Sequence, residues 1–306
     1  MTATGKFIKI PKSKIDYKIV VVDEVSMAPL TLIKQLFSHN VHVLCLGDPY
    51  QLPPIDKNED NHLLDNPHIF LDEVMRQAAE SKIIRLTMDI RAGREIKICS
   101  EGDAMVLPKN QLNTGILTWA DQNLVATNRT RFEINSQMRD MAGRGKMPED
   151  GDKVICTRNY WDLLADNEDP LVNGTIGYIS NPFNDFVMVN RYGLKELEYI
   201  RADFTSETGA EFGNIILDKQ KLLTGNPTLD RKQTYQMTKT RFRTAIPYEF
   251  DFAYAVTVHK AQGSEWGKVA VIEEGFPFDR EEHSRWLYTA CTRAAEQLVW
   301  VKNSNF

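Results

Sequence analysis

Hydrophobic positions near the start of the chain follow the pattern of a strand, a helix and a second strand. Residues Ile19–Val22 are consecutive β-branched residues, which predicts a strand buried on both faces of a parallel sheet. Helical spacing covers residues 29–38, and a second apolar run covers residues 41–46. Units of this length form parallel crossovers, so both strands should end at the same edge of one sheet.

Polar residues follow both predicted strands at that edge. Asp23 and Glu24 follow the first strand, and Asp48 and Gln51 follow the second. In open α/β sheets, ligands bind beyond the carboxyl ends of the strands. Nucleotide hydrolysis needs an Asp that holds Mg²⁺ and a Glu that polarises the attacking water. The pattern therefore indicates a nucleotide site, with a solvated strand end as the alternative.

The two segments resemble known helicase motifs. Residues 23–27 (DEVSM) and 47–54 (GDPYQLPP) are similar to motifs II and III of superfamily 1 helicases, in the branch of RecD-like and Dda-like enzymes. This resemblance implies ATP and Mg²⁺ as cofactors. It implies that Asp23 holds the metal, Glu24 is the general base, Gln51 senses the γ-phosphate and Asp48 belongs to the nucleotide site.

The composition of the chain is compatible with a nucleotide-dependent, DNA-binding protein and limits how such a protein could bind DNA. The chain of 306 residues can form two domains, and its net charge of −5 excludes a generally basic coat. DNA would then bind in a local groove lined by Lys, Arg and aromatic residues. The four cysteines lie far apart without a CxxC pair, which favours free thiols and no zinc site. No signal peptide or membrane-length apolar run is present, so we expect a cytoplasmic protein without membrane contact.

A third motif follows the PP turn. The segment Leu71–Gln77 resembles motif IV, and a helix is predicted to continue to Gly93. The resemblance assigns Arg76 to an arginine that reaches the γ-phosphate. An exposed arginine on an amphipathic helix is the alternative.

The middle of the chain contains a predicted strand, helix and insertion. The strand 124–127 resembles motif IVa, in which Thr127 and Asn128 would touch the DNA backbone. Residues 151–155 and 172–179 resemble the start of an SH3-like barrel. Alternation over residues 186–189 and 196–200 predicts short antiparallel strands there.

The segment Phe252–Trp266 is nearly identical to the AYAxTVHKxQGSE form of motif V. It offers Thr257, His259, Lys260 and Ser264 to DNA phosphates within eight residues. The resemblance also implies that Gly263 and Glu265 contact the nucleotide. Residues 285–294 resemble motif VI, which makes Arg293 an arginine finger on the transferring phosphoryl group. A last strand at residues 297–301 is expected to close the sheet.

The first residues contain Thr4-Gly5-Lys6, which does not meet the requirements of a P-loop. The family's P-loop precedes motif II, so we expect this chain to lack it and a chain or segment that supplies the P-loop to be a partner. We then expect inefficient ATP hydrolysis by the chain alone and an unpaired edge at residues 43–46.

Together the motifs predict an α/β fold of RecA-like parallel-sheet domains with an SH3-like insertion. Residues 1–74 would belong to an incomplete first domain, 75–150 and 246–306 to the second, and 151–245 to the insertion. The implied function is an ATP-dependent helicase that moves 5′ to 3′ on single-stranded DNA and acts at single-strand/duplex junctions. A Pif1-like helicase and a catalytically inactive single-stranded-DNA-binding fragment are the alternatives.

Overall fold

A computed structural model of the chain describes residues 14–71, 81–188, 196–239, 243–275 and 279–303. The described residues form two compact units. We call residues 14–131 and 256–303 the split unit, and residues 132–255 the inserted unit. The domain boundaries predicted at residues 150 and 245 stay a prediction. Thr4, Lys6 and Arg76 lie outside the described residues.

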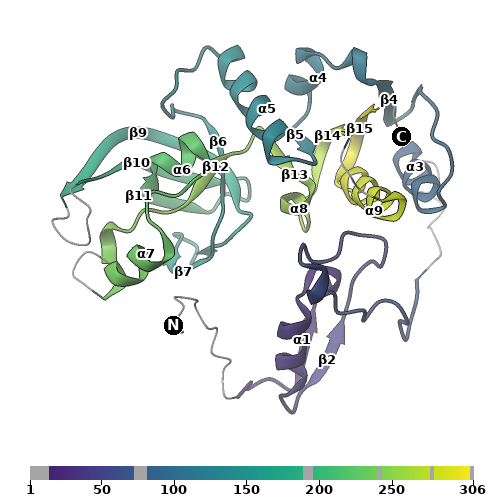
Figure 1. Cartoon of the computed structure of the whole chain (residues 1–306), viewed down its shortest axis with the longest axis horizontal. Coiled ribbons are helices and arrows are strands. Elements are labelled where there is room, and N and C mark those ends of the chain that lie inside the picture. Colours follow the sequence, from purple (N-terminus) through teal and green to yellow (C-terminus); the bar gives the residue numbers. More distant parts are fainter. Residues whose placement is uncertain (1–13, 72–80, 189–195, 240–242, 276–278, 304–306) are drawn as a thin grey trace. The chain divides into compact units, whose positions relative to one another are not determined.

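The split unit begins with the predicted strand, helix and strand (Figure 1). Its elements are β1 (Ile19–Val22), η1 (Val25–Met27), α1 (Leu30–Phe37), β2 (His42–Cys45) and η2 (Lys57–Glu59). Strands β1 and β2 are parallel, in a register from Ile19↔His42 to Val22↔Cys45. The prediction of burial on both faces is wrong, because Ile19 is 64% exposed and Val21 is 56% exposed. In the described part of the chain, α1 covers only the opposite face of these strands.

A second, six-stranded sheet forms the rest of the split unit, in the order β13-β5-β14-β15-β4-β3. Its central strands are parallel, and β3 is antiparallel to β4. The strands are β3 (Cys99–Glu101), β4 (Ala104–Pro108), β5 (Gln122–Val125), β13 (Ala255–Thr257), β14 (Trp266–Ile272) and β15 (Ala294–Lys302). The predicted α/β fold is confirmed, but β15 does not close the sheet, because β4 pairs with its far edge.

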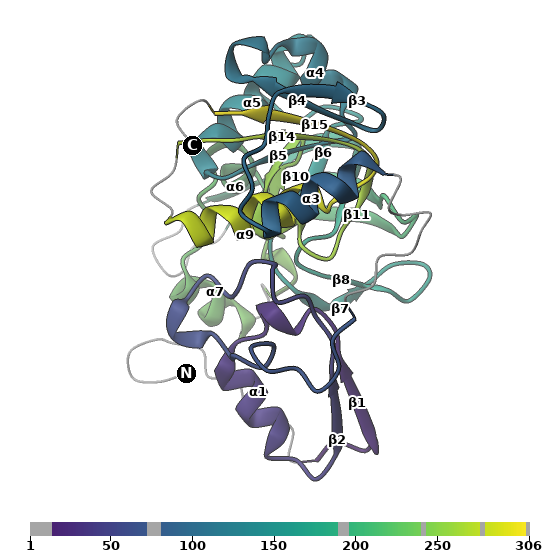
Figure 2. The ribbon, with the colours of Figure 1, turned by 90° about the vertical axis from the view of Figure 1, so that its right-hand side faces the viewer.

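Helices cover this sheet on both faces (Figure 2). Helices α3 and α9 pack together and lie against β15, and α4 packs on β14. The helices and short turns are α3 (Lys82–Arg91), η3 (Lys109–Gln111), α4 (Thr114–Trp119), α5 (Asn128–Met141), α8 (Val258–Ala261) and α9 (Arg280–Cys291). Helix α9 begins at its N-cap Asp279, whose side chain accepts the Glu282 N–H at 2.8 Å. Helix α3 begins in the same way at Ser81.

The inserted unit is built on a five-stranded antiparallel sheet in the order β11-β10-β9-β6-β12. Phe204, Phe212 and Phe250 pack in its core. Its elements are β6 (Lys153–Cys156), β7 (Tyr160–Leu164), β8 (Pro170–Leu171), β9 (Ile176–Met188), β10 (Glu196–Ser206), β11 (Glu211–Asp218), α6 (Lys219–Thr224), α7 (Arg231–Thr238), η4 (Arg243–Ala245) and β12 (Phe250–Phe252). Strands β9 and β10 are longer than the alternation predicted, and the SH3-like barrel stays a prediction.

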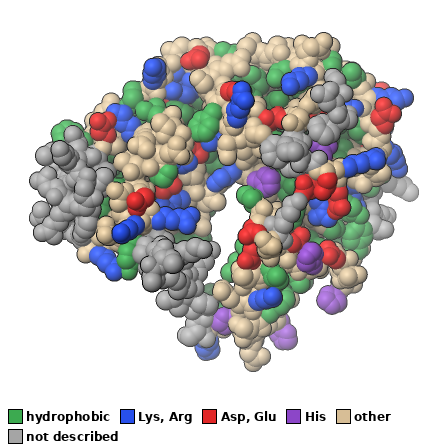
Figure 3. All heavy atoms as spheres, viewed as in Figure 1, with side chains coloured by type: hydrophobic (Ala, Val, Ile, Leu, Met, Phe, Trp, Pro, Cys, Tyr) green, Lys and Arg blue, Asp and Glu red, His purple; other side chains and the backbone are tan. Residues whose placement is uncertain are grey.

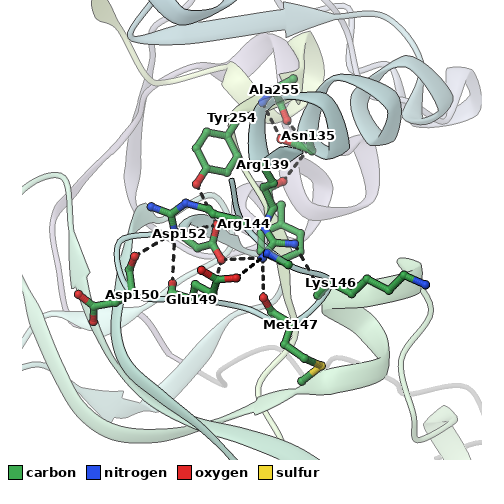
Figure 4. A network of polar contacts seen from close by, with 12 residues as sticks. Asn135, Arg139, Arg144, Lys146, Met147, Glu149, Asp150, Asp152, Tyr254 and Ala255 are labelled. Carbon is green, nitrogen blue, oxygen red and sulfur yellow. Dashed lines mark hydrogen bonds and ion pairs between the residues drawn. The ribbon is translucent and has the colours of Figure 1, made fainter. Parts of the chain in front are cut away.

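A buried polar network within the inserted unit connects α5 to the segment that follows β12 (Figure 4). The fully buried Asp152 accepts hydrogen bonds from Arg139 Nε at 3.0 Å and from the Tyr254 hydroxyl at 2.9 Å. Burial raises the pKa of Tyr254 to about 12, so its hydroxyl keeps its proton and donates. Asn135 of α5 binds the backbone N–H and C=O of Ala255. The start of the motif V segment is therefore held rigidly against α5.

Candidate nucleotide site and DNA-binding segment

The turn after β1 holds the two predicted catalytic acids. The Val25 N–H donates to the Leu46 carbonyl at 2.9 Å, which places this turn beside the end of β2. Glu24 has a left-handed backbone with φ of 49°, which is uncommon for a residue other than glycine. Its N–H donates to Asp23 Oδ1 at 2.8 Å, and Asp23 itself is exposed. Strained backbone of this kind is often found at functional sites.

Several buried oxygen atoms near this turn have no hydrogen-bond partner in the described part of the chain. They are Glu24 Oε2, Ser26 Oγ, Gln51 Oε1 and Gln262 Oε1. Buried polar atoms in native proteins are almost always hydrogen-bonded, so this group indicates a site for a polar ligand. The sequence placed Ser26 in motif II and Gln262 in motif V, but neither was assigned a role. Nothing in their local pattern shows that an oxygen stays without a partner.

The segment after β2 contacts the motif V and motif VI segments. The Leu52 carbonyl accepts a hydrogen bond from Gln262 Nε2 at 3.1 Å, and the Leu52 N–H donates to Thr289 Oγ1 of α9 at 3.0 Å. Gln51 is 8% exposed, and Asp48 accepts the Tyr288 hydroxyl at 2.6 Å. The structure thus brings the predicted Asp48 and Gln51 together with the helix that leads to Arg293.

Arg293 is buried at the end of α9. Its Nε, Nη1 and Nη2 atoms donate to Thr289 O, Ser264 O and Thr292 Oγ1 at 3.1 to 3.2 Å. Burial lowers the pKa of Arg293, while the carboxylates of Glu24, Glu265 and Asp48 act in the opposite direction. A guanidinium remains charged despite such burial. Arg293 is therefore a fixed cation within electrostatic reach of three of the predicted nucleotide-site acids.

The motif V segment supplies β13, α8 and the turn that follows. Thr257 lies at the end of β13, and His259 and Lys260 lie in α8. Gly263 has a left-handed backbone with φ of 79°, which lets the chain turn sharply before Ser264. Exposed Glu265 follows immediately before β14. These residues therefore lie on one strand, helix and turn, and their roles stay predictions.

His259 lines a cavity of about 700 Å³ within the split unit, together with Ser26, Gln51 and Pro53. Burial lowers the pKa of His259, so its imidazole is neutral at neutral pH. It can therefore contact a ligand through a ring N–H or by stacking, but not as a cation.

Thr127 and Asn128, predicted to touch DNA, lie at the start of α5. Glu274 accepts hydrogen bonds from the Thr127 N–H at 2.9 Å and from the Thr127 hydroxyl at 2.8 Å. It also accepts the Thr130 hydroxyl, while Asn128 is exposed. The sequence interpretation did not identify Glu274, although it follows an apolar strand as Glu24 does. The Thr127 donors are thus already used within the protein.

The split unit combines parallel strands, covering helices and acids at strand ends, as nucleotide-binding α/β folds do. Residues 252–301 match the UvrD-like helicase C-terminal domain, and residues 6–105 match an AAA domain. The ATP-dependent RecD2 DNA helicase of Deinococcus radiodurans is 25% identical over 312 residues. That alignment covers 92% of this chain but only 36% of the relative. The chain therefore spans about a third of the relative's length.

Solved structures share this fold. The crystal structure of the Pif1 helicase from Candida albicans has a TM-score of 0.54 at 19% identity, and covers 94% of this chain and 72% of that one. A second, described as the structural basis for DNA unwinding at forked dsDNA by two coordinating Pif1 helicases, has a TM-score of 0.52 at 15% identity. The aligned region covers 97% of this chain and 74% of the chain in that structure. The predicted resemblance is confirmed: the chain is similar in sequence to a RecD2 helicase, and it shares its fold with Pif1 helicases.

Proposed function

We propose that this chain is part of an ATP-dependent DNA helicase that moves on single-stranded DNA and acts at single-strand/duplex junctions. The observation that carries the proposal is the set of unpartnered buried oxygens on Glu24, Ser26, Gln51 and Gln262. They belong to segments that contact one another, and Arg293 provides a buried positive charge among them. The carboxylate and amide oxygens accept hydrogen bonds and match a donor such as the attacking water, while Arg293 matches the phosphate oxygens of a nucleoside triphosphate.

The proposed hydrolysis step uses Glu24, Gln51 and Arg293. Glu24 accepts a proton from water while the water oxygen bonds to the γ-phosphorus and the bond to the β,γ-bridging oxygen breaks. The products are ADP and phosphate. Gln51 contacts the γ-phosphate, and Arg293 stabilises the charge that develops on it. Three N–H groups of Arg293 are engaged, which leaves further guanidinium donors for phosphate oxygens.

Asp23 is the proposed Mg²⁺ ligand. In the described ranges no group of three or more His, Cys, Asp or Glu side chains is arranged to hold a metal ion. This agrees with Mg²⁺ held by one carboxylate and the phosphates of its nucleotide. Asp23 fits that role because it is exposed and one of its oxygens already accepts the Glu24 N–H. When bound, Mg²⁺ would neutralise phosphate charge.

Thr257, His259, Lys260 and Ser264 form the proposed DNA-binding segment. Acidic and basic side chains are interspersed on the face drawn in Figure 3, in agreement with the net charge of −5. Affinity would then come from a few local contacts and stacking rather than from a broad positive field.

No helix in the described part of the chain is long and apolar enough to cross a membrane.

ATP turnover in the presence of single-stranded DNA, measured with a P-loop segment supplied to the chain, tests the nucleotide site. Glu24→Gln should lower kcat by about 100-fold or more while nucleotide affinity changes little, because a general base acts on the transition state. The matched control is Glu296→Gln, which alters an exposed glutamate of β15 and should leave turnover unchanged. Equal turnover in the Glu24 variant and the wild type would contradict the proposal.

Fluorescence anisotropy at fixed salt tests the DNA-binding segment. The double variant His259→Ala/Lys260→Ala should weaken single-stranded DNA binding by about 1–3 kcal/mol. Lys109→Ala, in the exposed η3 turn, is the control and should have little effect. An unchanged dissociation constant in the double variant would refute this assignment. Duplexes with a 5′ or a 3′ tail would test the proposed 5′ to 3′ direction.

A further inference from the structure

The loop Asp48–Leu52, which carries Gln51, is attached to helix α9 at its first residue. Asp48 Oδ2 accepts the Tyr288 hydroxyl at 2.6 Å, and Asp48 Oδ1 accepts the Tyr50 N–H at 2.9 Å. Burial is the main cause that raises the pKa of Tyr288, so its hydroxyl keeps its proton and is the donor. Such hydrogen bonds to a carboxylate are stronger than those between neutral groups.

The last residue of the same loop is attached one position further along α9. Thr289 Oγ1 accepts the Leu52 N–H at 3.0 Å, and Thr289 is fully buried. The carbonyl of Thr289 accepts a hydrogen bond from Arg293 Nε at 3.2 Å. One residue of α9 therefore contacts both the loop that carries Gln51 and the side chain of Arg293.

Arg91 of α3 supports this attachment from the side. Its guanidinium carbon lies 3.7 Å from the centre of the Tyr50 ring and 5.9 Å from the centre of the Tyr288 ring. The two tyrosine rings meet edge to face, with centres 6.2 Å apart. Cation–π and aromatic contacts of this kind restrict the rings to one arrangement. Tyr288 is thus held where its hydroxyl reaches Asp48.

We propose that Tyr288 is a positioning residue, which through Asp48 holds Gln51 at a fixed place relative to Arg293. This inference rests on the proposed function, because it assigns Gln51 and Arg293 to the same phosphate group. Gln51 lies between the two attached residues, and its Oε1 atom is buried without a partner among the described residues. A small displacement of such a group is costly for catalysis, since reacting groups must be aligned closely.

Two measurements on the whole 306-residue chain test the inference. The first is amide hydrogen exchange of a peptide that contains Gln51 and Leu52. Tyr288→Phe should raise its exchange rate by about tenfold, because the loop loses a hydrogen bond to a charged acceptor. Tyr254→Phe is the matched control, since it also removes a tyrosine hydroxyl from an aspartate, but in the inserted unit. It should leave exchange of this peptide unchanged.

The second measurement separates positioning from a purely structural role. With a P-loop segment supplied to the chain and with saturating single-stranded DNA, Tyr288→Phe should lower kcat for ATP about tenfold, while KM for ATP stays within about twofold. The melting temperature should fall by no more than the Tyr254→Phe control. Thr289→Val, which removes the acceptor of the Leu52 N–H with little change in volume, should reproduce the effect on kcat.

The outcomes separately test the attachment of the loop to α9 and the positioning role of Tyr288. Unchanged exchange in both Tyr288→Phe and Thr289→Val would overturn the attachment itself. Faster exchange with an unchanged kcat would overturn positioning. A wild-type chain that binds neither nucleotide nor DNA would refute the proposed function and the catalytic part of this inference, while the exchange data would still report on the attachment.

Discussion

Strands β1 and β14 of the split unit have the same sequence pattern but different surroundings. Each is an apolar run followed by two acids, Asp23–Glu24 after β1 and Glu273–Glu274 after β14. Strand β14 has a strand neighbour on each edge, and Val269, Ala270 and Val271 are fully buried. In the described chain β1 pairs only with β2, and one of its faces is exposed.

The acids differ even more than the strands. Glu273 accepts the Trp300 Nε1–H at 3.0 Å and the Asn303 N–H at 2.9 Å, and its other oxygen lies 2.9 Å from His283 Nε2. Glu274 is bound by the start of α5. Glu24 instead has a buried oxygen without a partner in the described residues. The comparison teaches that two acids after a strand indicate a catalytic role only where a carboxylate oxygen lacks a hydrogen-bond partner.

The largest expected effect on stability is at Glu273. Glu273→Gln should reduce the free energy of unfolding by about 3 kcal/mol, because it replaces a buried carboxylate that accepts the Trp300 and Asn303 N–H groups. Urea denaturation followed by circular dichroism measures this. A loss below about 1 kcal/mol would mean that the two strand ends are energetically alike.

Substitutions within the two strands should have the next largest effect on stability. Val271→Ala should cost about 2 kcal/mol, because Val271 is fully buried and its loss creates a cavity. Val21→Ala, the same change at a residue that is 56% exposed, should cost about 0.5 kcal/mol. Equal losses in the same denaturation experiment would show that the exposed face of β1 is covered in solution.

Glu274 should have a smaller effect than Glu273. Glu274→Gln keeps one acceptor oxygen but loses the negative charge beside the Ala126 and Thr127 N–H groups just before α5, so we expect a loss of about 1 kcal/mol in the free energy of unfolding. Thermal unfolding at low and high salt provides the measurement. A loss as large as that of Glu273→Gln would contradict this order.

The smallest expected effect on stability is at Glu24. Glu24→Gln should change the free energy of unfolding by no more than about 0.5 kcal/mol, because the buried Oε2 atom has no hydrogen bond to lose in the described chain. The same variant should abolish most ATP turnover. If denaturation instead shows a loss above about 1.5 kcal/mol, Glu24 has a structural role.

Local patterns predicted a large part of the fold. Residues 19–22 and 42–45 are parallel strands joined by a helix, and β15 lies where the sequence predicted the last strand. Strand β3 was missed because it is three residues long and largely polar, and β4 was missed because its short apolar run is stabilised mainly by pairing with β15. The length of β9 and β10 was missed because each strand is stabilised by the other.

The sequence by itself determined several of the strands and helices, and which motifs place acids, a glutamine and an arginine near strand ends. Only the tertiary structure decided that Glu273 and Glu274 are satisfied while Glu24, Ser26, Gln51 and Gln262 keep oxygens without partners. It also decided that Tyr288 meets Asp48, 240 positions away in the chain. The physical reason is that hydrogen-bond partners come from distant segments, so whether a polar atom is satisfied depends on packing and not on local pattern.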